Sequence, residues 1–392
     1  MDVGNEHKQA TESIHENRKS LRRLREILFA NVVMAGEIPA PTGAERNLTR
    51  FLSDRFTECW LNDISQDQEG NVAAVLSGRD PKRNLLVAAH VDKIWPESDD
   101  HTVSVGVGMM SGRGIADNGL GVAVLATLPW VLDALNVKLN SNLILLGTTR
   151  SFGRGDLGGM RFFLNNSNRK IDAALCVEGM NLGRLSYSSL GMARGVISVA
   201  MPIPGESADD VTSGVISALN RLVTSILELN RKGFPETRIL LGSVEAGSGY
   251  NVPPGSGKLR FEIRSEDAEN VKEVEKVVVD LVQKFDREES GKVMVEMIAH
   301  RQPGNLGDDH PLVGQARIAL EELGIEPRVE PSISELAALL DKKIPALTLG
   351  ITKGEGRHSP DETIHLEPIF DGLAQIVSVL QFMDSGNFSF EE

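Results

Sequence analysis

Residues 84–92 read Asn84-Leu85-Leu86-Val87-Ala88-Ala89-His90-Val91-Asp92, an apolar run that ends in an imidazole and a carboxylate. A short apolar run bounded by polar residues is typical of a buried strand. In an α/β sheet, binding and catalytic sites form at the carboxyl ends of the strands. The stretch therefore predicts a buried strand that carries chemically active side chains at its end.

Similar apolar runs alternate with helical periodicity along both ends of the chain. This alternation predicts an α/β fold, with a central mixed sheet flanked by helices. The expected strands are residues 71–76, 84–89, 142–146, 173–177 and 346–350, and the expected helices are 119–135, 158–164, 311–323 and 368–382.

The middle of the chain has a different pattern, in the order β-α-β-β-α-β. That order predicts an inserted ferredoxin-like α+β domain. We expect this domain to cover residues 194–299, and residues 1–193 and 300–392 to form one discontinuous domain. The expected elements of the insertion are strands at 196–201, 238–242, 258–264 and 292–298, with helices at 213–229 and 268–285.

The composition narrows the class of protein. The chain has 392 residues, of which 41% are apolar and 24% charged, as in soluble proteins that fold into more than one domain. A net charge of −14 argues against a nucleic-acid partner, because phosphate binding needs concentrated Lys and Arg.

The sequence also favours a cytoplasmic protein with no membrane partner. Its two cysteines suggest reduced thiols, and the charged first thirty residues do not resemble a secretory signal. Pro129 and Asp133 interrupt the most apolar stretch, residues 119–137, which we interpret as a buried helix.

Four candidate side-chain groups follow strands or glycine-rich turns in the α/β part. They are His90 with Asp92, Asp117 in Gly114-Ile115-Ala116-Asp117-Asn118-Gly119, Glu178 after the strand at 173–177, and His358 in Gly354–Glu362. Taken singly, His90-x-Asp92 is equally well a hydrogen-bonded structural pair, and Asp117 a helix N-cap. Four such groups at successive strand ends favour a metal site, in which a carboxylate orients a ligating imidazole.

The order and surroundings of these residues resemble the zinc-dependent exopeptidase and amidohydrolase family of aminoacylases, succinyl-diaminopimelate desuccinylase, tripeptidase T and glutamate carboxypeptidases. The resemblance spans nearly the whole chain, through Ile38–Glu45, Gly70–Val72, Ala89–Asp92, Asp117–Gly119, Asn251–Pro254, Ile263–Arg264 and Gly356–Glu362. It implies a zinc-exopeptidase-like catalytic domain and an inserted lid that also forms a homodimer.

By this resemblance, His90 binds one metal, Asp117 bridges two metals and Glu178 completes the first site. Asp92 would hold His90, and His358 would bind the second metal. Zinc is the expected metal, although His, Asp and Glu ligands also suit other divalent ions.

The same resemblance places the catalytic glutamate at position 150 and a second-metal glutamate at position 151, but this chain has Arg150 and Ser151. Arginine cannot act as a base because it stays protonated in proteins. We therefore predict that Arg150 takes an altered role, as a fixed cation paired with Asp117 in the space of the second metal, and that one zinc binds per chain. The alternative is that Arg150 points outward in a shifted loop, while Asp156 or Glu355 supplies the missing carboxylate.

The resemblance also implies that Asn251 and Arg264, thirteen residues apart, grip a substrate carboxylate. A guanidinium suits that partner well, although a surface arginine on a strand is the simpler interpretation. The lid histidine that the family uses to stabilise an oxyanion has no counterpart, and Ser207 stands in its place.

Three functions are consistent with these observations. The first is a hydrolase of amide or peptide bonds in small carboxylate-bearing substrates, such as a small peptide or N-acyl amino acid, with one metal and altered or reduced activity. The second is a non-catalytic relative that binds a carboxylate ligand or a protein partner in the cleft that would hold the active site of a catalytic relative. The third is a hydrolase in which Arg150 stabilises developing negative charge beside a single zinc.

Overall fold

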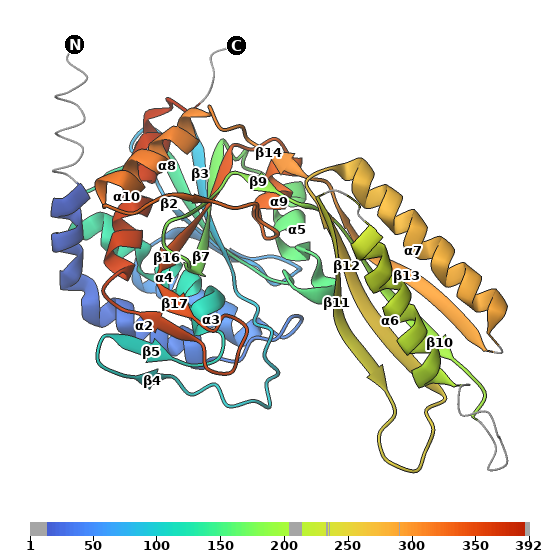
Figure 1. The fold of residues 1–392 in the computed structure, drawn as a ribbon. Coiled ribbons are helices and arrows are strands. Elements are labelled where there is room, and N and C mark those ends of the chain that lie inside the picture. Colours follow the sequence, from blue (N-terminus) through green and yellow to red (C-terminus); the bar gives the residue numbers. More distant parts are fainter. Residues whose placement is uncertain (1–13, 204–213, 233, 235, 290, 389–392) are drawn as a thin grey trace. The chain divides into compact units, whose positions relative to one another are not determined.

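The computed structural model describes residues 14–203, 214–232, 234, 236–289 and 291–388. The chain divides into two compact units (Figure 1). The first contains residues 1–188 and 305–392, and the second contains residues 189–304. Each unit has its own hydrophobic core.

An eight-stranded mixed sheet forms the centre of the first unit. Its strands are β1 (Asn62–Gln66), β2 (Val72–Leu76), β3 (Asn84–His90), β6 (Asn142–Thr148), β7 (Ala173–Met180), β8 (Arg184–Ser186), β15 (Arg328–Val329) and β16 (Ala346–Thr352). Their order is β1-β2-β6-β3-β7-β16-β8-β15. The four central strands, β6, β3, β7 and β16, are parallel, whereas β2 and β8 run antiparallel to their inner neighbours. The predicted α/β fold with a mixed sheet is confirmed.

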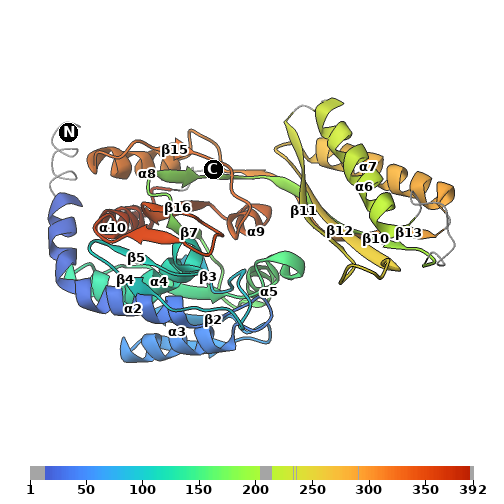
Figure 2. The same cartoon turned by 60° about the horizontal axis from the view of Figure 1, so that its bottom comes forward.

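Helices cover both faces of this sheet (Figure 2). One face packs against α2 (Arg25–Glu37), α3 (Arg46–Glu58), α4 (Leu120–Ala134), α8 (Pro311–Glu322) and α10 (Ile369–Ser385). The other face packs against α5 (Gly158–Asn166) and α9 (Leu336–Asp341), which contact each other. Because both faces are covered, the central strands are apolar throughout.

One helical stretch, Ile115–Ala134, is long and apolar enough to cross a membrane. Within the first unit, however, 89% of its most apolar window is buried. It packs against α2, β3 and β7, as expected for a core helix.

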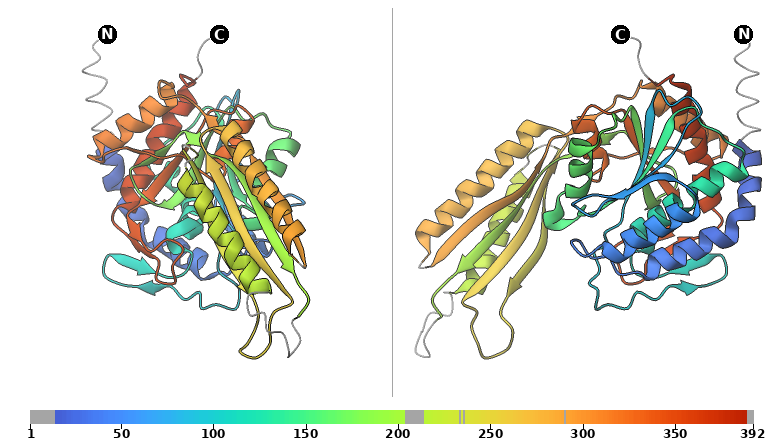
Figure 3. Two further views of the ribbon diagram at one scale, coloured as in Figure 1. Left: turned by 45° about the vertical axis from the view of Figure 1, so that its right-hand side comes forward. Right: turned by 180° about the vertical axis from the view of Figure 1, so that it is seen from behind.

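The second unit is a four-stranded antiparallel sheet with two helices on one face (Figure 3). Its elements are β10 (Gly191–Ala200), α6 (Val215–Lys232), β11 (Thr237–Ala246), β12 (Ser256–Ser265), α7 (Ala268–Glu288) and β13 (Lys292–Arg301). The strand order β11-β12-β10-β13 with this β-α-β-β-α-β sequence is a ferredoxin-like topology. Buried apolar residues recur every three or four positions on α7, at Val271, Val274, Val278 and Val282.

The boundaries expected from the sequence, at 193/194 and 299/300, fall inside β10 and β13. These two strands pair with each other and begin and end the second unit, so the unit is slightly longer than its apolar pattern suggested.

Several short elements were not anticipated. They include α9, β1 and a small sheet of β4 (Ser104–Val105), β5 (Met109–Ser111), β17 (Gly354–Glu355) and β18 (Thr363–His365). A two-stranded pair, β9 (Ser188–Ser189) with β14 (Gly304–Asn305), lies where the chain passes between the units. Two- and three-residue strands have too little periodicity to be detected from sequence.

A glycine lets β7 approach the turn that precedes α4. A β-carbon on Gly179 would lie 1.8 Å from the carbonyl oxygen of Asp117, so no other residue fits there without moving the backbone. The neighbouring positions, Asp117 and Glu178, are both candidate site residues. The close approach therefore sets the distance between them.

We expect Gly179→Ala to destabilise the protein by about 1–3 kcal/mol, the range typical of overpacking a tight site. Chemical denaturation would measure this change. The matched control is Gly314→Ala in α8, where an added β-carbon meets no atom within 4 Å. That control should gain about 0.5–1 kcal/mol, because glycine weakens a helix interior. Equal stability of the Gly179→Ala variant and the unmodified protein would contradict the close approach.

Candidate metal centre

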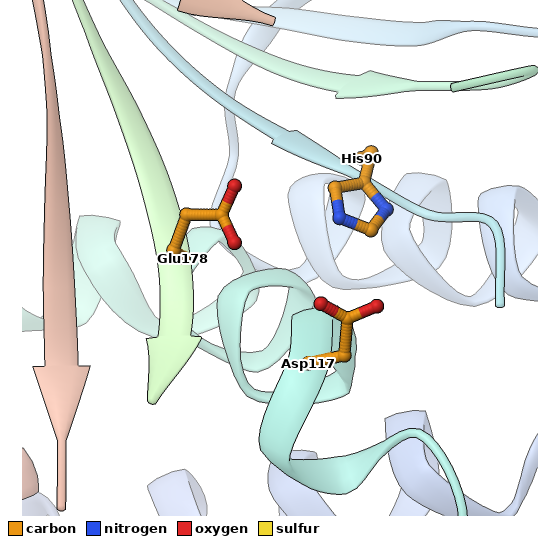
Figure 4. Close-up of side chains that lie close together, drawn as sticks. All are labelled: His90, Asp117 and Glu178. Atoms are coloured by element: carbon orange, nitrogen blue, oxygen red, sulfur yellow. The ribbon is translucent and has the colours of Figure 1, made fainter. Parts of the chain in front are cut away.

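Three predicted ligands converge in the first unit. His90 ends β3, Glu178 lies on β7, and Asp117 belongs to the short helical turn η2 (Ile115–Gly119). Their ligand atoms all lie within 4.8 Å of one another, and the three residues are buried. Figure 4 shows the three side chains pointing toward a common space.

Strand register brings His90 and Glu178 together. In the parallel pair β3–β7, Ala88 lies opposite Cys176, so the side chains two positions farther along leave the sheet on the same face. Asp117 approaches from the side, because its backbone (φ −83°, ψ −109°) interrupts the helical path before α4. The site thus combines two strands with one non-helical turn.

His90 is oriented by Asp92. Its Nδ1 atom lies 3.1 Å from the Asp92 carbonyl oxygen and 3.5 Å from Asp92 Oδ1, which leaves Nε2 for another partner. Burial opposes protonation of His90, but its hydrogen bond with Asp92 and the charge of Glu335 raise its pKa to about 10. Asp92 stands where the sequence predicted a residue that holds His90.

A guanidinium occupies the space beside two of the ligands, and it belongs to Arg357. Its Nε donates to Asp117 Oδ1 at 2.9 Å, and its Nη2 to Glu178 Oε2 at 3.0 Å. Burial would raise the pKa of Asp117 and of Glu178, but the positive charge of Arg357 helps to hold both below their usual values. The predicted fixed cation exists, but it comes from the loop after β17.

The predicted pairing of Arg150 with Asp117 is wrong. The Arg150 guanidinium pairs with Glu69, and 47% of the Arg150 side chain is exposed. Its backbone has φ 54°, the left-handed region, and this conformation directs the side chain outward. The alternative interpretation of the sequence, with Arg150 pointing outward, describes its position correctly.

Four peptide N–H groups hold the loop that carries Arg150. Thr149 donates to Asn71 Oδ1, and Arg150 donates to Glu45 Oε1. Ser151 and Phe152 both donate to Asp92 Oδ2, each at 2.9 Å. These bonds define which side chain of the loop faces inward, and the inward side chain is Ser151.

Neither carboxylate that the sequence offered as a replacement faces the site. Asp156 pairs with Arg161, and Glu355 is exposed on β17. A different carboxylate, Glu335 at the start of α9, is buried and accepts a hydrogen bond from Ser151 Oγ at 2.5 Å. Ser332 followed by Glu335 before an apolar run is a signature of a helix start, and it could have identified this segment.

His358 lies at the edge of the site. Its Nε2 atom is 3.4 Å from Asp117 Oδ2, and 45% of its side chain is exposed. Glu362 is fully buried and accepts from the backbone N–H groups of Ala116 and His358, at 2.8 and 2.9 Å. It therefore ties the Asp117 turn to the loop of Arg357 and His358. The ring of Phe152 makes edge contacts with both His90 and His358.

The donor set fits one divalent ion. One imidazole and two carboxylates within 4.8 Å provide the three protein ligands typical of a catalytic zinc site, with a fourth position left for water or substrate. A second ion does not fit equally well. Position 151 offers only a hydroxyl that is already bonded to Glu335, and Arg357 is in contact with both carboxylates.

The residues predicted to grip the substrate are not brought together within the second unit. Asn251 is exposed in the loop between β11 and β12, whereas Arg264 lies near the far end of β12. The strand from Ser256 to Arg264 spans about 26 Å at 3.3 Å per residue. Arg264 and Arg194 instead both pair with Glu262. Ser207 lies outside the described residues.

The chain thus combines a mixed sheet with a parallel centre, a His–Asp–Glu cluster formed by two strands and a helical turn, and an inserted unit of ferredoxin-like topology. Its family follows from the sequence profile of Peptidase family M20/M25/M40, which matches residues 86–381. The chain belongs to this family.

The chain is 24% identical over 243 residues to succinyl-diaminopimelate desuccinylase from Vesicomyosocius okutanii, a match that spans 58% of this chain and 64% of that relative. Its fold is similar to the di-peptidase Dug1p from Saccharomyces cerevisiae, with a TM-score of 0.77 and 15% identity over 96% of this chain and 98% of that one. It is also similar to a dinuclear metal binding M20 peptidase from Bacillus subtilis, with a TM-score of 0.60 and 16% identity over 91% and 99% of the two chains.

The position of Arg357 predicts that this residue weakens metal binding. Unit charges 4 Å apart repel by about 4 kcal/mol at an effective dielectric of 20, and a divalent ion roughly doubles this. Solvent reduces the effect, since 28% of the Arg357 side chain is exposed. We therefore expect Arg357→Gln to bind zinc at least about tenfold more tightly, as measured by competition with a chromophoric chelator.

Arg150→Gln is the matched control, because Arg150 faces solvent and Glu69. Its zinc affinity should stay within about twofold of the unmodified protein. An unchanged affinity in Arg357→Gln, or a gain confined to Arg150→Gln, would contradict the assignment of the cation to Arg357.

Proposed function

We propose that this protein is a single-metal hydrolase of amide or peptide bonds in small carboxylate-bearing substrates, such as short peptides or N-acyl amino acids, with altered or reduced activity. The observation that carries the proposal is the His90–Asp117–Glu178 cluster with Arg357 on its two carboxylates. Membership of the peptidase family supports the reaction class, and the names of the similar proteins support the substrate class.

The chain's own groups have distinct tasks in this scheme. His90 would bind zinc through Nε2, and Asp117 and Glu178 would bind it through carboxylate oxygens. When bound, such an ion lowers the pKa of a coordinated water and polarises a carbonyl. Arg357 is the only candidate among the described residues already in contact with two of these ligands, and its guanidinium would stabilise negative charge that develops on the carbonyl oxygen of the substrate. This is the role that the sequence assigned to Arg150.

Reduced activity follows from positions 150 and 151. Arg150 faces away, and Ser151 carries no carboxylate, so neither position provides a general base. Loss of general-base assistance typically lowers a rate by roughly 10²- to 10⁴-fold.

One observation favours a non-catalytic function as the second candidate. Arg357 already pairs with both Asp117 and Glu178, so part of their negative charge is compensated without a metal. Such a site could retain a carboxylate ligand without turning it over.

Metal analysis combined with a substrate screen tests the proposal. We expect one zinc ion per chain after reconstitution and slow hydrolysis of some N-acyl amino acids or short peptides. Both zinc binding and hydrolysis should be lost in His90→Ala, because the cluster then retains only two ligands. His310→Ala is the control, because His310 is a buried histidine that caps α8 by accepting from Leu312 N.

The outcomes separate the candidates. Two zinc ions per chain would overturn the single-metal centre. Measurable ligand binding without turnover of any substrate would support the non-catalytic function. Hydrolysis that persists unchanged in His90→Ala would show that the reaction takes place elsewhere.

We further propose a cytoplasmic homodimer formed through the second unit. Both cysteines are free thiols, which suits a reducing compartment. Apolar side chains are exposed on α6 and β11, at Ile216, Leu227, Leu240 and Val244, and we propose that they contribute to the contact with a second chain. Light scattering should give twice the chain mass, falling to the monomer mass in Leu240→Glu/Val244→Glu; a monomeric unmodified protein would refute the dimer.

A further inference from the structure

Glu335 is a buried carboxylate for which the sequence predicted no role in the site. It precedes α9, which packs against the end of β16 on the α5 face of the sheet. Only 2% of the residue is exposed, although a buried ionised carboxylate is costly unless it has partners. Its position therefore requires a reason.

Its partners are two hydroxyl groups, one at the end of β6 beside His90 and one in the loop that follows β6. Ser151 Oγ donates to Glu335 Oε1 at 2.5 Å, and Thr148 Oγ1 donates to the same oxygen at 3.4 Å. Glu335 and Ser151 are separated by 184 positions in sequence and are both buried. The contact therefore links α9 directly to the loop that lacks the expected glutamates.

The backbone of this loop leaves Ser151 only one direction. Its N–H is bonded to Asp92 Oδ2, and the N–H of Phe152 is bonded to the same oxygen, so the side chain between them points inward. A glutamate at position 151 would extend into the space that the Glu335 carboxylate fills. Two carboxylates in hydrogen-bond contact cannot both be ionised. Position 151 and position 335 can therefore hold one ionised carboxylate between them.

Glu335 also lies next to the strand pair that carries a metal ligand. Thr148, which donates to Glu335 Oε1 at 3.4 Å, lies opposite His90 in the parallel pair β3–β6. A negative group held here attracts a cation to the same space.

We propose that Glu335 is the carboxylate that this metal centre lost at position 151, supplied from α9 and presented through the Ser151 hydroxyl. Glu335 acts through Ser151 and Thr148, and Thr148 lies opposite His90 in the sheet, so Glu335 is a positioning residue for the cation. This inference rests on the proposed single-metal centre. It assigns no further ligand, since the ligand cluster consists of His90, Asp117 and Glu178.

The first experiment removes the charge of Glu335 and keeps its shape. Glu335→Gln retains an oxygen that can accept from Ser151, so the local packing is preserved. We expect zinc alone to bind this variant at least about tenfold more weakly in a chelator-competition assay, with no loss of thermal stability. Glu355→Gln is the matched control, because Glu355 is an exposed carboxylate on β17 that the sequence offered as a replacement, and the zinc affinity of this variant should not change.

The second experiment moves the carboxylate back. Ser151→Glu alone should be strongly destabilised, because it places two carboxylates in one buried space. Glu335→Ser alone should lose zinc affinity, because the charge is absent. The double variant Ser151→Glu/Glu335→Ser should recover both thermal stability and zinc affinity to within about threefold of the unmodified protein.

The outcomes distinguish failure of the Glu335 inference from failure of the proposed function. Unchanged zinc affinity in Glu335→Gln would overturn the inference. A double variant whose loss of stability equals or exceeds the summed losses of the two single variants would also overturn it. Should the double variant fail to fold, the affinity of Glu335→Gln decides. If the unmodified protein binds no zinc, the proposed function fails. The relocation of the carboxylate is then supported if the double variant is more stable than both single variants, and it is refuted if the double variant is not.

Discussion

Arg357 forms the interaction on which the rest of the site depends, with its guanidinium placed between Asp117 and Glu178. Two buried carboxylates so close together repel each other unless a positive group compensates them. In a two-metal enzyme the ions provide that compensation, whereas here a covalently attached cation provides part of it. Glu362 holds the loop of Arg357 against the Asp117 turn, so the compensation is part of the fold.

Hydrogen bonds to the backbone of residues 149–152 determine which side chains point into the site. Asn71, Glu45 and Asp92 accept the N–H groups of four consecutive residues after β6. With these bonds formed, Arg150 points toward Glu69 and Ser151 toward Glu335. The identity of a residue at an expected catalytic position therefore says little about what replaces its function, because the direction of the side chain comes from hydrogen bonds made elsewhere.

The family scaffold and the chemistry of this site are separable. The profile match, the mixed sheet and the ferredoxin-like unit establish membership of the peptidase family. Function depends on particular side chains, and a fold can keep its architecture while its site changes. In this chain one three-residue ligand cluster is present, Arg357 places a positive charge on its two carboxylates, and Glu335 places a carboxylate against Ser151.

The sequence by itself determined the long central strands and the insertion, because these depend on local periodicity, and its resemblance to a known family identified the cluster of His90, Asp117 and Glu178. It also showed that positions 150 and 151 lack carboxylates. Only the tertiary structure decided that Arg357 and not Arg150 is the cation, and that Glu335 faces Ser151. The physical reason is distance along the chain. Arg357 meets Asp117 across 240 positions and Glu335 meets Ser151 across 184, and such contacts arise from packing and backbone direction, which no local pattern encodes.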